Sequence, residues 1–206
     1  MRKPRHLEVD AIYHVTARIN RRAMELAPPF IKELFISTVK RATKKYAFEL
    51  FAWSIMDNHI HLLIHPLNEV LLPNLMRWIL GVFALSFNRL LGLTGHLWHD
   101  RYRSTIITGK QHFYRTFFYI ANNPVRAGLS GTAAGFRFSH IRDILESCWG
   151  ITTRPGRRIT NELERLCELC SPSKIRKDIG FHLQKPGRKK DSMRENSAKS
   201  DARNDC

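Results

Sequence analysis

Hydrophobic positions between residues 31 and 46 recur at the spacing of one helical face, while the lysines of this segment lie mostly outside that stripe. This pattern predicts an amphipathic helix that follows Pro28 and Pro29. A longer helix, predicted over residues 74–91 and ended by Gly92, is apolar on most sides. Such a helix is expected to be deeply packed or to lie at an interface.

The strands predicted from the sequence are segments rich in β-branched and aromatic residues. Asp57 and Asn58 form a turn between two of them, because Asp and Asn tolerate the tight backbone geometry of a hairpin. A third helix is predicted from about Lys110 to Asn123, since Pro124 disfavours helical geometry in the residue before it. The expected strands are residues 11–17, 48–56, 59–65 and 102–108.

The resulting order, β-α-β-β-α-β-α, predicts an α+β fold in which helices pack on an antiparallel sheet, in a ferredoxin-like or RRM-like arrangement. The chain changes character near residue 150, so we expect one folded domain over residues 1–150 and a short helical extension over residues 151–180. Residues 181–206 contain almost nothing to bury, which predicts a disordered basic tail.

The charge of the chain narrows the classes of partner. It has 34 Lys and Arg residues against 18 Asp and Glu residues among 206, for a formal net charge of +16. Such a surface is expected to bind polyanions, nucleic acid first and an anionic membrane second. The most apolar stretch, residues 78–93, is broken by Asn88 and Arg89 and is too short to span a bilayer. With no signal peptide visible, we expect a cytoplasmic protein without a membrane partner.

A run of histidines in the third predicted strand carries the sharpest chemical signal. His59 and His61 alternate along the strand, so their side chains share one face. Two adjacent imidazoles can bind a metal ion, but histidines that only form hydrogen bonds on a half-buried strand fit the same pattern. His65 shares this face at the strand end, which leaves open a zinc hydrolase built on three histidines.

The third predicted helix carries a second candidate group. Its large hydrophobic residues fall on one broad arc, and Tyr119 is the aromatic residue of the opposite, polar arc. Asn123 stands one turn later on that face, and Arg115 lies on the same arc. The arrangement offers a phenol nucleophile, an oxygen ligand and a guanidinium for phosphate. A tyrosine half exposed among ordinary surface groups is the alternative.

Four blocks of sequence occur in a definite order, and together they are more specific than any one alone. They are Tyr13-His14-Val15-Thr16 with Arg18, Met56-Asp57-Asn58-His59-Ile60-His61-Leu62-Leu63, Gly95-His96-Leu97-Trp98 running into Arg101-Tyr102-Arg103-Ser104, and Tyr119-Ile120-Ala121-Asn122-Asn123-Pro124-Val125-Arg126-Ala127-Gly128. These blocks resemble the IS200/IS605-like single-tyrosine transposases of the HUH superfamily, and most closely the branch associated with repetitive extragenic palindromes (REP). Ile19 and Asp57 depart from the family pattern, where many relatives have glycine and proline.

The resemblance implies an HUH-type nuclease domain and a metal-dependent endonuclease and strand transferase that acts on single-stranded or hairpin DNA. His59 and His61 would bind Mg²⁺ or Mn²⁺ with Asn123 as the third ligand. Tyr119 would attack the phosphate and form a 5′-phosphotyrosine intermediate. A bacterial, nucleoid-associated protein is implied, as a monomer or a homodimer. The alternative is a domesticated protein that recognises hairpin DNA without cleaving it.

Basic residues gather around the four blocks, and arginine suits phosphate because its planar fork can bind two oxygens at once. Trp98 and Tyr102 lie among them, and they either stack on unpaired bases or pack in the core. The residues expected to contact DNA are Arg2, Lys3, Arg5, Arg18, Arg21, Arg22, Arg101, Tyr102, Arg103, Arg115 and Arg126.

Overall fold

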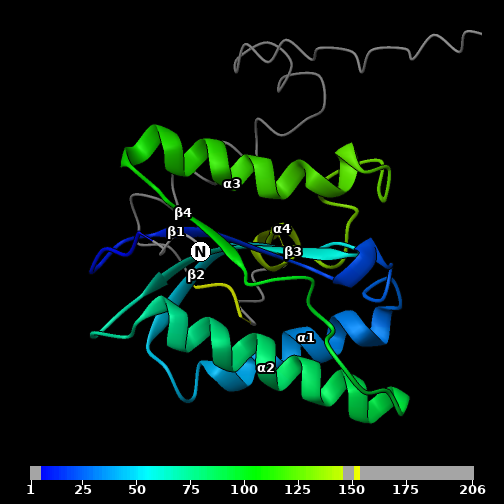
Figure 1. The fold of residues 1–206 in the computed structure, drawn as a ribbon. Helices are drawn as coiled ribbons and strands as arrows, with labels where there is room; N and C mark the ends of the chain where they lie inside the picture. Colours follow the sequence, from blue (N-terminus) through cyan, green and yellow to red (C-terminus); the bar gives the residue numbers. More distant parts are fainter. Residues whose placement is uncertain (1–5, 146–150, 154–206) are drawn as a thin grey trace, which may run out of the picture. The chain divides into compact units, whose positions relative to one another are not determined.

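A computed structural model describes residues 6–145 and 151–153 of the chain. Its centre is a four-stranded antiparallel sheet in the order β2-β3-β1-β4, with helices on both faces (Figure 1). The predicted α+β class and the order β-α-β-β-α-β are therefore confirmed. The elements are β1 (Tyr13–Arg18), a 3₁₀ turn (Asn20–Arg22), α1 (Pro29–Ala42), β2 (Phe48–Ile55), β3 (His59–Pro66), α2 (Leu72–Leu91), β4 (Arg103–Ile106), α3 (Gly109–Arg126) and α4 (His140–Leu145).

The two faces of the sheet contribute to two separate hydrophobic clusters. The larger cluster joins the sheet to α1 and α2 and includes Leu62 and Phe83. The smaller cluster joins the sheet to α3 and includes Leu63 and Phe117. Figure 1 shows the same layers, with α1 and α2 together on one side of the sheet and α3 on the other. Since neighbouring residues of a strand point to opposite faces, β2 and β3 contribute to both clusters.

The outer edge of β2 is covered by segments that follow α3. Ile55 donates its backbone N–H to the carbonyl of Phe138 at 3.0 Å, and Thr153 donates to the carbonyl of Leu50 at 2.8 Å. A bulge between Leu50 and Ala52 lets Phe51 join the cluster under α3. The short helix α4, which the sequence did not predict, belongs to this covering segment. These contacts cover the edge of the sheet at β2.

The helix that carries Tyr119 ends later than predicted. α3 continues through Pro124 to Arg126, so the prediction that it ends near Asn123 was wrong. Proline lacks an N–H and crowds the carbonyl four residues earlier, which is costly in a helix interior. Pro124, however, is buried and lies only two residues before the helix end. The backbone N–H of Ala127 then bonds to the carbonyl of Asn123 at 3.0 Å and closes the last turn.

The chain separates into two compact units, Met1–Leu166 and Cys167–Cys206. The second unit lies wholly outside the described residues, as do the predicted basic tail and all but residues 151–153 of the predicted helical extension. The predicted domain boundaries therefore stay predictions. Across residues 6–145 and 151–153, none of the helices has the length and apolar character needed to cross a membrane.

Candidate active site

A polar strip crosses the side of the sheet that faces α3. His59 and His61 of β3 lie on this face, two residues apart, as the alternation predicted. Strand pairing places Arg18 of β1 opposite His59, and Thr16 opposite His61. Arg103 of β4 pairs with Thr16 on the other side. The strip therefore concentrates imidazole and guanidinium groups from three adjacent strands on one face.

Helix α3 brings Tyr119 onto this strip. Phe113, Phe117 and Ile120 are buried toward the sheet, as the predicted apolar arc requires. Tyr119 is 39% exposed, yet its ring centre lies 5.6 Å from that of His61, with the rings edge to face. The same chain thus supplies both the tyrosine and the histidines of the site.

His14 lies on the same face of the sheet and forms a polar cluster with His59, His61 and Tyr119. It was not among the predicted site residues. Its ring lies nearly parallel to that of His61, with an angle of 21° between the planes and the centres 5.2 Å apart, and it meets the ring of Tyr119 edge to face at 5.9 Å. Nε2 of His14 lies 3.0 Å from Nδ1 of His61. The signal that could have found it is the alternation of β1, which puts His14 on the same face as Thr16 and Arg18.

The turn between β2 and β3 orients His59. Nδ1 of His59 lies 2.7 Å from Oδ1 of Asn58, an oxygen that can only accept a hydrogen bond. The ring therefore carries its proton on Nδ1 and leaves the lone pair of Nε2 for a ligand. Asn58 is held by the segment after β1, because its amide donates to the carbonyl of Arg22 at 3.2 Å and its own carbonyl accepts from Ile19 at 2.9 Å.

The two departures from the family pattern both have a structural role. Lys32 of α1 is buried, and its Nζ donates to Oδ1 of Asp57 at 2.6 Å and to the carbonyl of Ala27 at 3.0 Å. A proline at position 57 has no carboxylate, so Asp57 gives this turn an ion pair with α1. Ile19 is buried in the larger cluster and bridges to Trp98.

Burial keeps the three histidines of the cluster neutral near pH 7. Burial, together with the smaller effects of the neighbouring His59, His14 and Arg18, lowers the pKa of His61 to about 2. Burial also lowers the pKa of His59 to about 4 and that of His14 to about 4. Neutral imidazoles keep a lone pair available, which is the state that binds metal ions.

Two buried polar side-chain atoms, one on His61 and one on Asn123, are candidates for binding a ligand. Nε2 of His61 and Nδ2 of Asn123 have no hydrogen-bond partner within residues 6–145 and 151–153. Such atoms are rare in folded proteins, because burying them without a partner is costly. An imidazole pair with an amide, whose oxygen replaces its nitrogen after half a rotation, fits a divalent metal ion. Over the same residues, His, Cys, Asp and Glu side chains alone form no group of three suited to a metal.

His65 does not join the other two histidines. Its Nε2 lies 2.8 Å from Oδ1 of Asp10, and its Nδ1 lies 3.2 Å from Oε2 of Glu49. Both ring nitrogens are therefore engaged by carboxylates, and the geometry does not support a zinc hydrolase built on His59, His61 and His65.

The predicted DNA-contacting residues that the structure describes lie at several places. Arg126 places its guanidinium 5.5 Å from the ring centre of Tyr119, and Arg115 is exposed one turn before it. Arg21 and Arg22 are exposed in the 3₁₀ turn, with φ angles of 53° and 57°. The basic N-terminal residues lie outside the described part of the chain, and they are Arg2, Lys3 and Arg5.

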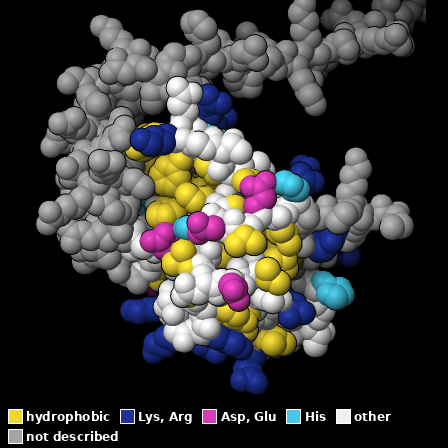
Figure 2. Space-filling model, turned by 90° about the vertical axis from the view of Figure 1, so that its left-hand side faces the viewer, with side chains coloured by type: hydrophobic (Ala, Val, Ile, Leu, Met, Phe, Trp, Pro, Cys, Tyr) yellow, Lys and Arg dark blue, Asp and Glu magenta, His cyan; other side chains and the backbone are white. Residues whose placement is uncertain are grey.

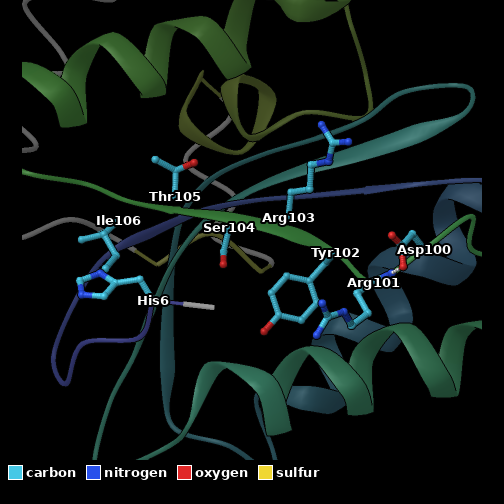
Figure 3. Close-up of a pocket in the computed structure, with 8 residues that line it drawn as sticks. All are labelled: His6, Asp100, Arg101, Tyr102, Arg103, Ser104, Thr105 and Ile106. Carbon is cyan, nitrogen blue, oxygen red and sulfur yellow. Dashed lines mark hydrogen bonds between the residues drawn. The ribbon is translucent and has the colours of Figure 1, made fainter. Parts of the chain in front are cut away.

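A cavity of about 620 Å³ runs along β4 and is lined by His6 and residues 100–106 (Figure 3). Arg103 points toward the α3 side of the sheet, whereas Arg101 and Tyr102 point toward α2. Tyr102 is 7% exposed and belongs to the larger cluster. Of the two roles expected for it, base stacking and core packing, the structure supports core packing. Its contact with DNA stays a prediction.

Another side of the molecule looks different. In Figure 2, hydrophobic and acidic side chains lie in the middle of the view, and most of the Lys and Arg side chains that are visible on this face lie toward its margins. The basic excess of the chain is therefore not spread evenly over this part of its surface.

Comparison with known proteins places this geometry in a family. A family model described as "Transposase IS200 like" matches residues 8–123, a range that holds every residue of the cluster. The structure of the REP-associated tyrosine transposase bound to a REP hairpin is similar, with a TM-score of 0.61 and 19% identity over 76% of this chain and 92% of that chain. A candidate transposase from Deinococcus radiodurans has a TM-score of 0.42 at 19% identity, over 59% of this chain and 97% of its own. No curated protein matches.

Proposed function

The chain belongs to the IS200-like transposase family, and we propose that it cleaves and rejoins DNA strands with Tyr119 as the nucleophile. The observation that carries this proposal is the approach of the Tyr119 ring to His61 and His14 on a sheet face that also holds arginines. A hydroxyl beside imidazoles and guanidinium groups suits attack on a phosphodiester.

We propose that His59 and His61 hold a divalent metal ion through Nε2, with the amide oxygen of Asn123 as the third ligand. Two imidazoles favour Mn²⁺ over Mg²⁺, which prefers oxygen ligands. When bound, the ion would polarise the scissile phosphate and neutralise the charge that develops there. The unpartnered Nε2 of His61, the Nδ1 hydrogen bond that leaves Nε2 of His59 with a lone pair, and the unpartnered Nδ2 of Asn123 support this ligand set.

The proposed reaction is a transesterification. The hydroxyl oxygen of Tyr119 forms a bond to phosphorus and gives up its proton to solvent, while the bond from phosphorus to the 3′ oxygen breaks. The 3′ oxygen takes up a proton and leaves as a hydroxyl, and the other DNA end stays attached as a 5′-phosphotyrosine. Because one phosphodiester replaces another, attack by a second 3′-hydroxyl can rejoin the strand without ATP. Arg126 and Arg18, which lie beside the cluster, would bind the phosphate.

We propose single-stranded or hairpin DNA as the substrate, in the bacterial cytoplasm and associated with the nucleoid. The net charge of +16 and the arginines around the site favour a nucleic acid. The hairpin bound by the structural relative supports this choice of probe. The contact between Tyr119 and His61 of the same chain supports the proposal that one chain can carry out the chemistry, whether the protein acts as a monomer or as a homodimer.

The test is to mix the protein with end-labelled hairpin DNA and Mn²⁺ and to separate the products on a denaturing gel. We expect a labelled, SDS-resistant adduct from the wild type and none from Tyr119→Phe, because only the nucleophilic oxygen is lost. Gel-shift affinity for the hairpin should stay the same. Tyr114→Phe, on the same helix, is the matched control and should still form the adduct.

Two results would contradict the proposal. Undiminished adduct from Tyr119→Phe would assign the nucleophile to another residue. Hairpin binding by the wild type without any adduct, across several hairpins and metal ions, would instead support the domesticated protein that binds DNA without cleaving it.

A further inference from the structure

The contact between His14 and His61 constrains where their protons lie. Nε2 of His14 and Nδ1 of His61 are 3.0 Å apart, which is hydrogen-bond distance. Two N–H groups cannot face each other at this distance, so one nitrogen donates and the other accepts. A neutral imidazole carries one N–H, and the choice made at this contact therefore decides the state of the remaining nitrogen of each ring.

Only one of the two arrangements leaves His61 able to bind a ligand. If His14 donates, His61 must carry its proton on Nε2, where the buried N–H has no acceptor among the described residues. If His61 donates from Nδ1 instead, its buried Nε2 carries a lone pair. When His61 donates from Nδ1, its buried Nε2 can therefore bind a metal ion.

His59 is arranged in the same way by a different partner. Its Nδ1 donates to Oδ1 of Asn58 at 2.7 Å, so its Nε2 is free. The two histidines of β3 thus have matching outer partners, each at Nδ1. For His59 the partner is the preceding residue, whereas for His61 it comes from the neighbouring strand.

The sheet register explains how His14 reaches this place. Thr16 of β1 pairs directly with His61, so His14, two residues before Thr16, is the diagonal neighbour of His61 on the same face. Diagonal neighbours on antiparallel strands are within reach of aromatic side chains. The two ring planes are inclined by only 21° and their centres are 5.2 Å apart, so the rings lie side by side and the N–H of one can point in its own plane at the nitrogen of the other.

We propose that His14 is a positioning residue that accepts the Nδ1 proton of His61 and so presents Nε2 of His61 to the divalent metal ion. The inference rests on the proposed function, because it concerns the same metal site. Outer partners of this kind orient metal-binding histidines, and their loss typically weakens metal binding by about 10-fold to 100-fold.

Metal affinity provides the first test. Mn²⁺ binding to the purified full-length protein would be titrated by the electron paramagnetic resonance signal of free Mn²⁺. His14→Phe keeps an aromatic ring at this position but removes the acceptor, and we expect its dissociation constant to rise by about 10-fold to 100-fold. His14→Gln keeps an acceptor oxygen and should recover most of the affinity. His96→Phe, an exposed histidine outside the cluster, is the control and should bind as the wild type does.

The second test reads the proton directly and does not depend on metal or activity. Long-range ¹H–¹⁵N spectra of histidine-labelled, metal-free protein distinguish the two neutral forms of each ring, and His61→Gln identifies the signals of His61. We expect the Nδ1–H form for His61 in the wild type and the Nε2–H form in His14→Phe. His59 should stay in the Nδ1–H form in both proteins, since Asn58 is unchanged. This measurement on the wild type decides the question even if His14→Phe fails to fold.

The outcomes separate the two proposals. An adduct-forming wild type in which His61 carries its proton on Nε2, or an unchanged Mn²⁺ affinity in folded His14→Phe, would overturn the role of His14 and leave the proposed function intact. A wild type that neither binds Mn²⁺ nor forms the adduct would overturn both.

Discussion

One face of the sheet packs the larger hydrophobic cluster, and the other face carries the candidate active site. On β1, Val15 is fully buried in the larger cluster, while its neighbour His14 contacts Tyr119 on the opposite face. On β3, Leu62 lies in the apolar layer next to His61 in the polar strip. A single strand thus supplies core packing and site chemistry with alternate residues.

The two faces of the sheet contribute differently to the free energy of unfolding. The apolar face packs against two helices and leaves few polar atoms, so it favours the folded state through burial. The face under α3 holds neutral buried histidines and an unpartnered nitrogen on His61, which cost stability in the absence of a ligand. Proteins commonly give up stability in this way at functional sites.

The largest effect is expected from an apolar substitution on the polar face. His61→Leu should reduce metal-dependent adduct formation by about 10³-fold, since it removes one of the proposed metal ligands. The free energy of unfolding should stay the same or rise by about 1 kcal/mol, because an unpartnered buried nitrogen is lost. Single-turnover cleavage and urea unfolding measure the two quantities.

The control for this variant is Ser54→Ala, which changes the residue opposite His61 on β2 and should keep the activity. A folded His61→Leu protein that cleaves at the wild-type rate in Mn²⁺ would show that the polar face is not the metal site.

The next effect comes from the apolar face. Leu62→Ala should lower the free energy of unfolding by about 2–5 kcal/mol, because it opens a cavity in a buried cluster. Cleavage per folded molecule should not change, since the residue points away from the strip. Urea unfolding gives the stability, and active-site titration by adduct formation gives the folded fraction. A loss of cleavage in molecules shown to be folded would contradict the separation of the two faces.

Much of the division between the faces could be predicted from the sequence, because alternation and helical spacing are local. The shared face of His59 and His61 and the buried arc of α3 both followed from such patterns. What could not be predicted depends on distant contacts. The sequence gives no sign that Tyr119 meets His14, since 105 positions separate them and only the packing of α3 on the sheet joins them.

Local rules also failed where tertiary packing outweighed them. Pro124 disfavours a helix, yet α3 continues past it because the proline lies near the helix end and is buried. Tyr102 has a basic neighbour on each side in the sequence, but its ring is buried in the larger cluster. The number of neighbouring charges therefore did not indicate which side chains reach solvent.

Acid should affect the two faces differently. Burial lowers the pKa of His61 from 6.5 to about 2. Between these two pH values, the unfolded chain binds a proton at His61 and the folded protein does not. Stability is therefore complete above about pH 6.5 and is lost as the pH falls, at up to about 1.4 kcal/mol per pH unit for this histidine. His61→Leu should make the slope shallower by about one proton, whereas Leu62→Ala should lower the whole curve without changing its slope.

Unfolding free energies measured at intervals between about pH 6.5 and pH 4 give these slopes. The slope should not vanish in His61→Leu, because burial also lowers the pKa of His140 to about 4, beneath α3. Equal slopes for the wild type and His61→Leu would mean that His61 is protonated in the folded protein, contrary to its burial.

The smallest expected effect is on the salt dependence of DNA binding, and it compares an arginine on each side of the sheet. Arg103 pairs with Thr16 on the polar strip, whereas the exposed Arg137 forms an ion pair with Glu33 of α1 at 2.7 Å. If DNA lies over the strip, Arg103→Ala removes one phosphate contact and should reduce the slope of log affinity against log salt concentration by about 0.7–0.9. Arg137→Ala should leave the slope unchanged. Fluorescence anisotropy with a labelled hairpin at several salt concentrations measures both, and equal slopes for the two variants would mean that DNA contacts do not follow the polar strip.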